Sequence, residues 1–187
     1  MFTCAEFFAG GGMARLGLGP AWRCVLANDN SHNKAYSYVV NHGREHFHFC
    51  NAAQLKPTDI PGTIDLGWSS SPCQDLSLAG SRTGLSGEKS KAFWDWWALT
   101  EKLVADNRAP RMNVLENVPG LASSHGGRDL ATARQAIKDQ DYDIALMKID
   151  ARHWVPQSRL RLFLVAVHRS LGANLAGYVA KAMDALP

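Results

Sequence analysis

The stretch that decides the fold is FTCAEFFAGGG, residues 2 to 12. Phe2 to Phe8 is an apolar run typical of a buried strand, and the four residues Ala9-Gly10-Gly11-Gly12 after it are typical of a tight turn. Met13 to Leu18 then predicts a short helix. Glycines in such a turn let the backbone approach a ligand closely, although a plain strand-to-helix connection uses them about as often.

The same alternation of strand and helix continues along the chain. Further strands are expected at Trp22 to Ala27, Phe47 to Cys50, Ile64 to Ser69, Met112 to Leu115, Ile144 to Ile149 and Arg161 to Val167. The helices between them are expected at His32 to Asn41, Phe93 to Val104 and Asp129 to Lys138. This pattern predicts an α/β fold with a Rossmann-like, doubly wound, mostly parallel sheet, in which ligands bind beyond the carboxyl ends of the strands.

Length and composition fit one globular domain. The chain has 187 residues, of which 46% are hydrophobic and 20% charged, and its formal net charge is +3. No apolar run approaches the roughly 20 residues that cross a bilayer, and the first residues include Glu6 and no basic residue, so we expect neither a membrane span nor a secretory signal. We expect a catalytic domain over residues 1–170 and a helical tail over 171–187.

The cysteines and arginines add two expectations. Four cysteines without a C-x-x-C pair predict neither a structural zinc site nor a disulfide framework, and they suit a reducing cytoplasm. No acidic residue occurs between Ala151 and Arg169, where positive charge gathers at Arg152, Arg159, Arg161 and Arg169. A solvated basic face would have the same composition.

Polar residues follow several of the expected strands. Asp29, about twenty residues after the glycine turn, lies where such folds place an acid that binds a ribose, which favours an adenosine-containing cofactor. Cys73, in Ser71-Pro72-Cys73-Gln74, lies where a nucleophile would be displayed, although a buried inert thiol is the commoner fate of a cysteine.

Two later motifs complete the set. Glu116, in Leu115-Glu116-Asn117-Val118-Pro119, is placed where it could lie beside Cys73; a helix cap or a surface carboxylate is the alternative. In Gln157-Ser158-Arg159-Leu160-Arg161, the alternation of an extended chain predicts that both arginines point to one face, unless they are simply surface residues.

In this order the motifs resemble those of the cytosine carbon-5 DNA methyltransferases. The resemblance rests on F-A-G-x-G at Phe8, P-C-Q at Pro72, E-N-V at Glu116 and Q-x-R-x-R at Gln157, and it extends from Phe2 to about His168. It implies the fold of S-adenosylmethionine-dependent methyltransferases and methylation of a cytosine that is rotated out of the duplex.

The resemblance also implies a role for each motif. Cys73 would be the nucleophile that adds to carbon 6 of cytosine, and Glu116 would hold ring nitrogen 3. Arg159 would orient the base through its carbonyl oxygen, and Arg161 would support the site or a phosphate.

S-adenosylmethionine is the implied cofactor and double-stranded DNA the implied substrate; no metal is implied. Cofactor contacts are expected from the glycine turn and from neighbouring strand ends, at Phe8, Ala9, Gly10, Gly11, Gly12, Asp29, Asn30, Asn51, Ala52 and Pro72. Contacts with the nucleic acid are expected at Gln74, Ser77, Arg82, Asn117 and Gln157. The Ser- and Gly-rich segment from Leu76 to Lys91 is expected to be either a lid that closes behind the base or a disordered stretch.

The sequence departs from the family pattern in a few places. Asp29 and Asn51 stand where the family usually has Glu and Asp, and Met13 replaces a glycine. Family members usually continue into a target-recognition domain, so we expect either a fragment or one subunit of a split enzyme whose second polypeptide reads the DNA. A prokaryotic or phage-encoded, cytoplasmic protein of a restriction-modification system is implied. An RNA cytosine methyltransferase and a catalytically silent subunit that binds cofactor or partner are the alternatives.

Overall fold

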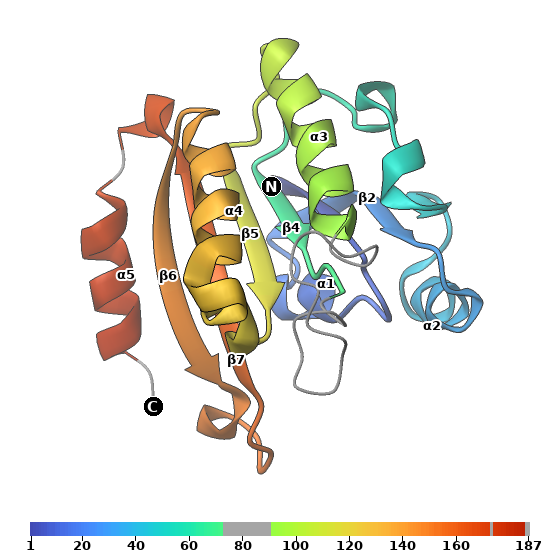
Figure 1. Cartoon of the computed structure of the whole chain (residues 1–187). Helices are drawn as coiled ribbons and strands as arrows, with labels where there is room; N and C mark the ends of the chain where they lie inside the picture. Colours follow the sequence, from blue (N-terminus) through green and yellow to red (C-terminus); the bar gives the residue numbers. More distant parts are fainter. Residues whose placement is uncertain (73–90, 173, 186–187) are drawn as a thin grey trace.

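The computed structural model describes residues 1–72, 91–172 and 174–185, which form a seven-stranded sheet with helices on both faces (Figure 1). The strands are β1 (Phe2–Phe7), β2 (Trp22–Asp29), β3 (Phe47–Phe49), β4 (Leu66–Ser69), β5 (Met112–Asn117), β6 (Tyr142–Asp150) and β7 (Leu160–His168). The α-helices are α1 (Met13–Leu18), α2 (His32–His42), α3 (Lys91–Ala105), α4 (Arg128–Lys138) and α5 (Leu175–Asp184). Short 3-10 helices include η1 (Ala52–Gln54) and η6 (Ala151–His153).

The order of strands in the sheet is β3-β2-β1-β4-β5-β7-β6. The neighbours among β1 to β5 pair in parallel, while β7 runs antiparallel to both β5 and β6. The predicted doubly wound, mostly parallel α/β sheet is therefore confirmed. Each predicted strand and helix is present, with ends that move by a few residues; the strand expected from Ile64 begins at Leu66, and the one expected from Ile144 begins at Tyr142.

The reversal of β7 has a simple cause in chain length. A parallel neighbour would need a crossover connection of a dozen or more residues, usually a helix, but only residues 151–159 join β6 to β7. The two strands therefore form an antiparallel hairpin, in which Asp150 pairs with Leu160. As a result β7 begins at the same edge of the sheet at which β5 ends, and Asn117 pairs with Leu162.

Two apolar clusters fix the sheet between its helices. On one face, the large side chains of α3 and α4 pack against the sheet, with Trp96, Trp97 and Ile137 fully buried. On the other face, Cys4, Cys24 and Tyr38 belong to a second cluster beneath α1 and α2. α3 and α4 lie in front of the sheet in Figure 1, and α5 lies beside the edge strand β6. This packing holds the carboxyl ends of the parallel strands in one row.

Candidate active site

The segments predicted to carry chemistry meet along the edge where the parallel strands end. The glycine turn follows β1, Asp29 closes β2, and Asn51 follows β3. Ser70 follows β4, and its backbone N–H donates to the carbonyl of Phe7 at 3.2 Å, which holds the chain leading to Pro72 beside the end of β1. The reversal of β7 brings the Q-x-R-x-R motif to this edge as well.

The glycine turn is held in a left-handed backbone conformation. Phe8, Gly10 and Gly12 have φ values of 56°, 57° and 81°. The backbone N–H of Ala9 donates to the carbonyl of Asn28 at 2.8 Å, and that of Gly12 donates to the carbonyl of Ala9 at 2.9 Å. The Asn28 side chain accepts from the backbone N–H of Phe8 at 3.3 Å. The end of β2 therefore shapes the turn that follows β1.

Asp29 braces the same turn. Its side chain is only 3% exposed, and its Oδ2 accepts from the backbone N–H of Gly10 at 3.1 Å while Oδ1 accepts from that of Ser31 at 2.9 Å. Lys34 lies 3.7 Å from Oδ2. A carboxylate offers about four lone-pair positions. Two of these lone-pair positions therefore already bind the backbone of the turn, and only the others remain for the hydroxyl groups of a ribose.

The residues after β3 are also engaged within the chain. Asn51 is exposed, and its Oδ1 accepts from the backbone N–H of Ala53 at 3.0 Å, so it caps the short helix η1. Gln54 completes the cap by accepting from the backbone N–H of Asn51 at 3.0 Å. Ala52 is buried and Asn30 is exposed.

Within the glycine turn, Gly10 is the position at which a ligand of the adenosine type could contact the backbone. A methyl group built on Gly10 would meet no atom of the described residues within 4 Å, whereas one on Gly11 would come within 3.2 Å of Ser37 Oγ. The Cα of Gly10 is therefore not covered by any described residue, and the Gly10 N–H donates to the Asp29 carboxylate. These features fit a ligand that approaches the backbone closely and carries hydrogen-bond donors.

A carboxylate and an arginine face each other at the ends of β5 and β7. Arg161 Nε lies 2.9 Å from Glu116 Oε1, and the two side chains are 21% and 22% exposed. Asn117 is buried, and its Oδ1 accepts from the backbone N–H of Val118 at 2.9 Å. Glu116 and Arg161 both stay partly open to solvent, so they can reach a ligand placed beyond the strand ends.

The structure separates the two arginines of the Q-x-R-x-R motif. Arg159 is exposed and precedes β7, on the turn that also carries the exposed Gln157. Pro72 is exposed at the end of the described segment that follows β4. Cys73, Gln74, Ser77 and Arg82, and the Leu76 to Lys91 segment apart from Lys91 itself, lie outside the described residues.

Sequence reasoning missed two buried acids. Asp150, at the end of β6, is only 5% exposed; its Oδ1 accepts from the backbone N–H groups of Arg152 and Arg159 at 3.1 and 2.7 Å, and its Oδ2 accepts from Ser158 Oγ at 2.9 Å. These donors, with Arg152, whose backbone N–H contributes most, hold the pKa of Asp150 below its usual range. An acid directly before a short turn is the signal that could have pointed to it.

Glu6 is the second missed acid. It lies in β1 directly before the glycine turn, is 3% exposed, and its Oε2 has no hydrogen-bond partner among the described residues. Burial, together with the neighbouring Cys24, raises its pKa to about 7, against the opposing effect of the backbone N–H groups of Arg15 and Ala14. An acid inside an apolar strand is the signal in the sequence.

A polar network beneath the turn links α1 to α2. Arg15 Nη1 donates to Tyr38 Oη at 3.3 Å and lies 2.5 Å from His46 Nε2, and Tyr38 Oη lies 3.0 Å from the same nitrogen. Cys24 is near, at 3.6 Å from Tyr38 Oη. Cys4, Cys24 and Cys50 are free thiols. Across the ranges that the structure describes, no three His, Cys, Asp or Glu residues are placed to hold a metal ion, and no helix could span a membrane.

Known proteins of similar fold include several methyltransferases. The crystal structure of S. pombe Dnmt2 methyltransferase matches with a TM-score of 0.71 and 22% identity, over 90% of this chain and 51% of that one. Magnesium protoporphyrin IX methyltransferase from Synechocystis PCC 6803, solved with bound SAM, matches with a TM-score of 0.53 and 18% identity, over 90% and 70% of the two chains. The sheet therefore has the fold of S-adenosylmethionine-dependent methyltransferases.

Comparison of the sequence with known proteins identifies the family more specifically than comparison of the fold does. The type II methyltransferase M.BsuFI of Bacillus subtilis is 29% identical over 92% of this chain and 41% of its own length. M.MthTI of Methanothermobacter thermautotrophicus is 30% identical over 89% of this chain and 49% of its own length, so the chain spans about half the length of such relatives. The family described as C-5 cytosine-specific DNA methylase matches residues 2–185. The chain belongs to that family.

Proposed function

We propose that this chain is the catalytic part of a DNA cytosine-5 methyltransferase that uses S-adenosylmethionine. The observation that carries the proposal is the Glu116 and Arg161 pair, held at 2.9 Å at the edge where β4 leads toward Cys73. Membership of the C-5 cytosine-specific DNA methylase family supports cytosine in DNA as the substrate.

In the proposed reaction, the Cys73 thiolate adds to carbon 6 of a cytosine rotated out of the duplex, which makes carbon 5 nucleophilic. After carbon 5 has taken up the methyl group, loss of the carbon-5 proton to water expels the Cys73 thiolate and breaks its bond to carbon 6. Glu116 binds the base at ring nitrogen 3 and favours the attack. Because Arg161 contacts Glu116 and Arg159 does not lie on β7, we assign the base carbonyl oxygen to Arg161 and a phosphate to Arg159. This exchanges the two roles expected from the sequence.

S-adenosylmethionine would supply the methyl group when bound. On the protein side, the open backbone at Gly10 would lie against the cofactor, and the remaining lone pairs of Asp29 would accept from ribose hydroxyls. Asn51 would reach the adenine with its amide nitrogen, since its Oδ1 already accepts from the backbone of Ala53. Phe8 and Pro72 would border the same space.

The test is transfer of a labelled methyl group from S-adenosylmethionine to mixed-sequence duplex DNA, by the chain and by its Cys73→Ser variant. Cys50→Ser, which replaces another thiol, is the matched control. The proposal expects transfer that Cys73→Ser abolishes and Cys50→Ser keeps. Transfer that survives in Cys73→Ser would contradict the mechanism, and transfer to RNA but not to duplex DNA would replace the substrate.

The same assay tests whether a second polypeptide is needed. The chain spans about half the length of relatives such as M.MthTI. Binding of S-adenosylhomocysteine, seen by calorimetry, without methyl transfer by this chain alone would mean that transfer needs a further polypeptide. Site-specific methylation by this chain alone would mean that it does not.

A further inference from the structure

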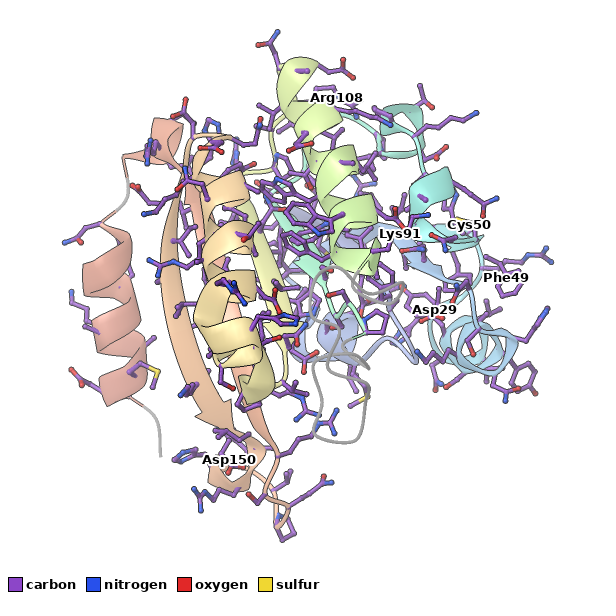
Figure 2. All side chains as sticks on the ribbon, in the orientation of Figure 1. Asp29, Phe49, Cys50, Lys91, Arg108 and Asp150 are labelled. Atoms are coloured by element: carbon purple, nitrogen blue, oxygen red, sulfur yellow. The ribbon has the colours of Figure 1, made fainter. Side chains whose placement is uncertain are left out.

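The turn between β6 and β7, residues 151–159, is fixed by one buried carboxylate. Asp150 accepts hydrogen bonds from two backbone N–H groups of the turn and from Ser158, and its Oδ2 also pairs with Arg152 Nε at 3.2 Å. The carbonyl of Arg159 accepts from the backbone N–H of Ala151 at 3.3 Å, which closes the turn. Figure 2 labels Asp150 where β6 ends. These contacts hold the backbone of the turn in a defined conformation.

The turn projects beyond the proposed base site. Its closing pair, Asp150 with Leu160, lies next to the pair of Ile149 with Arg161, and Glu116 pairs with Phe163 on the neighbouring strand. In Figure 1 the turn extends past the ends of β5 and β6. The turn therefore begins within a few residues of Arg161, the partner of Glu116.

The surface of the turn combines an exposed aromatic ring with positive charge. Trp154 is 58% exposed, and the neighbouring Val155 is exposed as well. Arg152 keeps 69% of its side chain exposed despite its pair with Asp150, and Arg159 is exposed. No acidic residue occurs among residues 151–169, so the buried Asp150, which pairs with Arg152, is the carboxylate nearest in sequence to the turn.

We propose that this turn is a contact surface for duplex DNA, in which Trp154 packs against a base or sugar next to the target cytosine while Arg152 and Arg159 bind flanking phosphates. The inference rests on the proposed function for its choice of partner. A base next to a cytosine that is rotated out of the duplex exposes a face on which an aromatic ring can stack whatever the sequence, and arginines bind phosphates. Because Asp150 already orders the backbone, binding loses little conformational entropy in the turn.

The experiment measures binding of the full chain to a fluorescein-labelled, mixed-sequence duplex by anisotropy, over a series of salt concentrations. We expect Trp154→Ala to bind about tenfold more weakly, the loss typical of one aromatic contact with a base, and Trp154→Phe to keep most of the affinity. Tyr178→Ala, which removes another exposed aromatic ring on α5, is the matched control and should bind as wild type does.

Salt dependence gives an independent variant. Arg159→Gln should reduce the slope of log affinity against log salt by about 0.9, the value for one lost phosphate contact, whereas Trp154→Ala should leave the slope unchanged. Both side chains are exposed, so the variants should unfold at the wild-type temperature, which a thermal melt checks.

Two results overturn the inference: a wild-type chain that does not bind duplex DNA, or equal affinity in wild type, Trp154→Ala and Arg159→Gln. If the chain transfers methyl groups but Trp154→Ala binds DNA as tightly as wild type does, only this inference fails. If DNA binding depends on Trp154 but no methyl group is transferred even with a second polypeptide added, the proposed function fails instead.

Discussion

At the scale of single residues, Glu6 shows how burial couples a side chain to pH. Its pKa is raised from an ordinary 4.5 to about 7, chiefly by burial. Between these two pH values the folded chain holds a proton that the unfolded chain has lost. The contribution of Glu6 to stability is therefore greatest below about pH 4.5 and falls as the pH rises toward 7, by a total of about 3 kcal/mol.

The variant Glu6→Gln tests this directly. It removes the titration, so its free energy of unfolding relative to wild type should rise by about 3 kcal/mol between pH 4.5 and pH 8. Urea unfolding followed by tryptophan fluorescence at several pH values measures the difference. Titrating groups that do not interact with Glu6, such as His46, whose pKa burial lowers, are common to both chains and cancel. Parallel pH profiles for the two chains would mean that Glu6 is not held in this way.

Glu116 obtains its ion-pair partner from the neighbouring strand of the sheet. Its sequence context predicted a carboxylate at a strand end, and its partner Arg161 comes from a strand that begins 44 positions later along the chain. The antiparallel register of β5 and β7 sets this contact. The motif alone could not choose between Arg159 and Arg161, because the start of the strand relative to the motif decides which of them faces Glu116.

At the scale of elements, two glycines of the turn are needed for different reasons: both have a positive φ, and only one lacks space for a side chain. Gly12 has a φ of 81°, and a side chain there would collide with the His42 ring of α2. Gly10 also has a positive φ, of 57°, but among the described residues no atom lies where its side chain would be. Both positions strain a residue with a side chain, while only Gly12 packs against a neighbour.

We therefore predict different effects for the two alanine variants. Gly12→Ala should lower the free energy of unfolding by about 2 kcal/mol or more, through strain and the displaced His42 ring. Gly10→Ala should cost about 1 kcal/mol in stability and should mainly weaken binding of S-adenosylhomocysteine. Urea unfolding and calorimetry measure the two effects. Equal losses of stability would show that the contact with His42 contributes nothing.

At the scale of the whole molecule, the sheet and its two apolar clusters lie within residues 2–168. α5 packs beside the edge strand β6 and follows the last strand of the sheet. A chain that ends at Ser170 should therefore keep one cooperative unfolding transition. Because the described side chains of α5 are mostly exposed, it should lose only about 2 kcal/mol, the order of burying a single apolar side chain. Urea denaturation of both lengths checks this. A broad or multistep transition in the shorter chain would place α5 within the cooperative core.

The sequence by itself determined the order of strands and helices, the position of the glycine turn and the family of the chain. These follow from local patterns: apolar runs predict strands, glycines mark the turn, and four spaced motifs identify relatives. Even the antiparallel end of the sheet has a local cause, since nine residues between β6 and β7 leave no room for a crossover helix.

Only the tertiary structure decided which atoms remain free for a ligand. The Asp29 carboxylate already accepts hydrogen bonds from the backbone N–H groups of Gly10 and Ser31, and the Asn51 side-chain oxygen accepts one from that of Ala53. The raised pKa of Glu6 and the contact of Arg161 with Glu116 likewise depend on neighbours from other elements. Hydrogen bonds and burial are set by the distances between such neighbours, which the local pattern of a sequence does not contain.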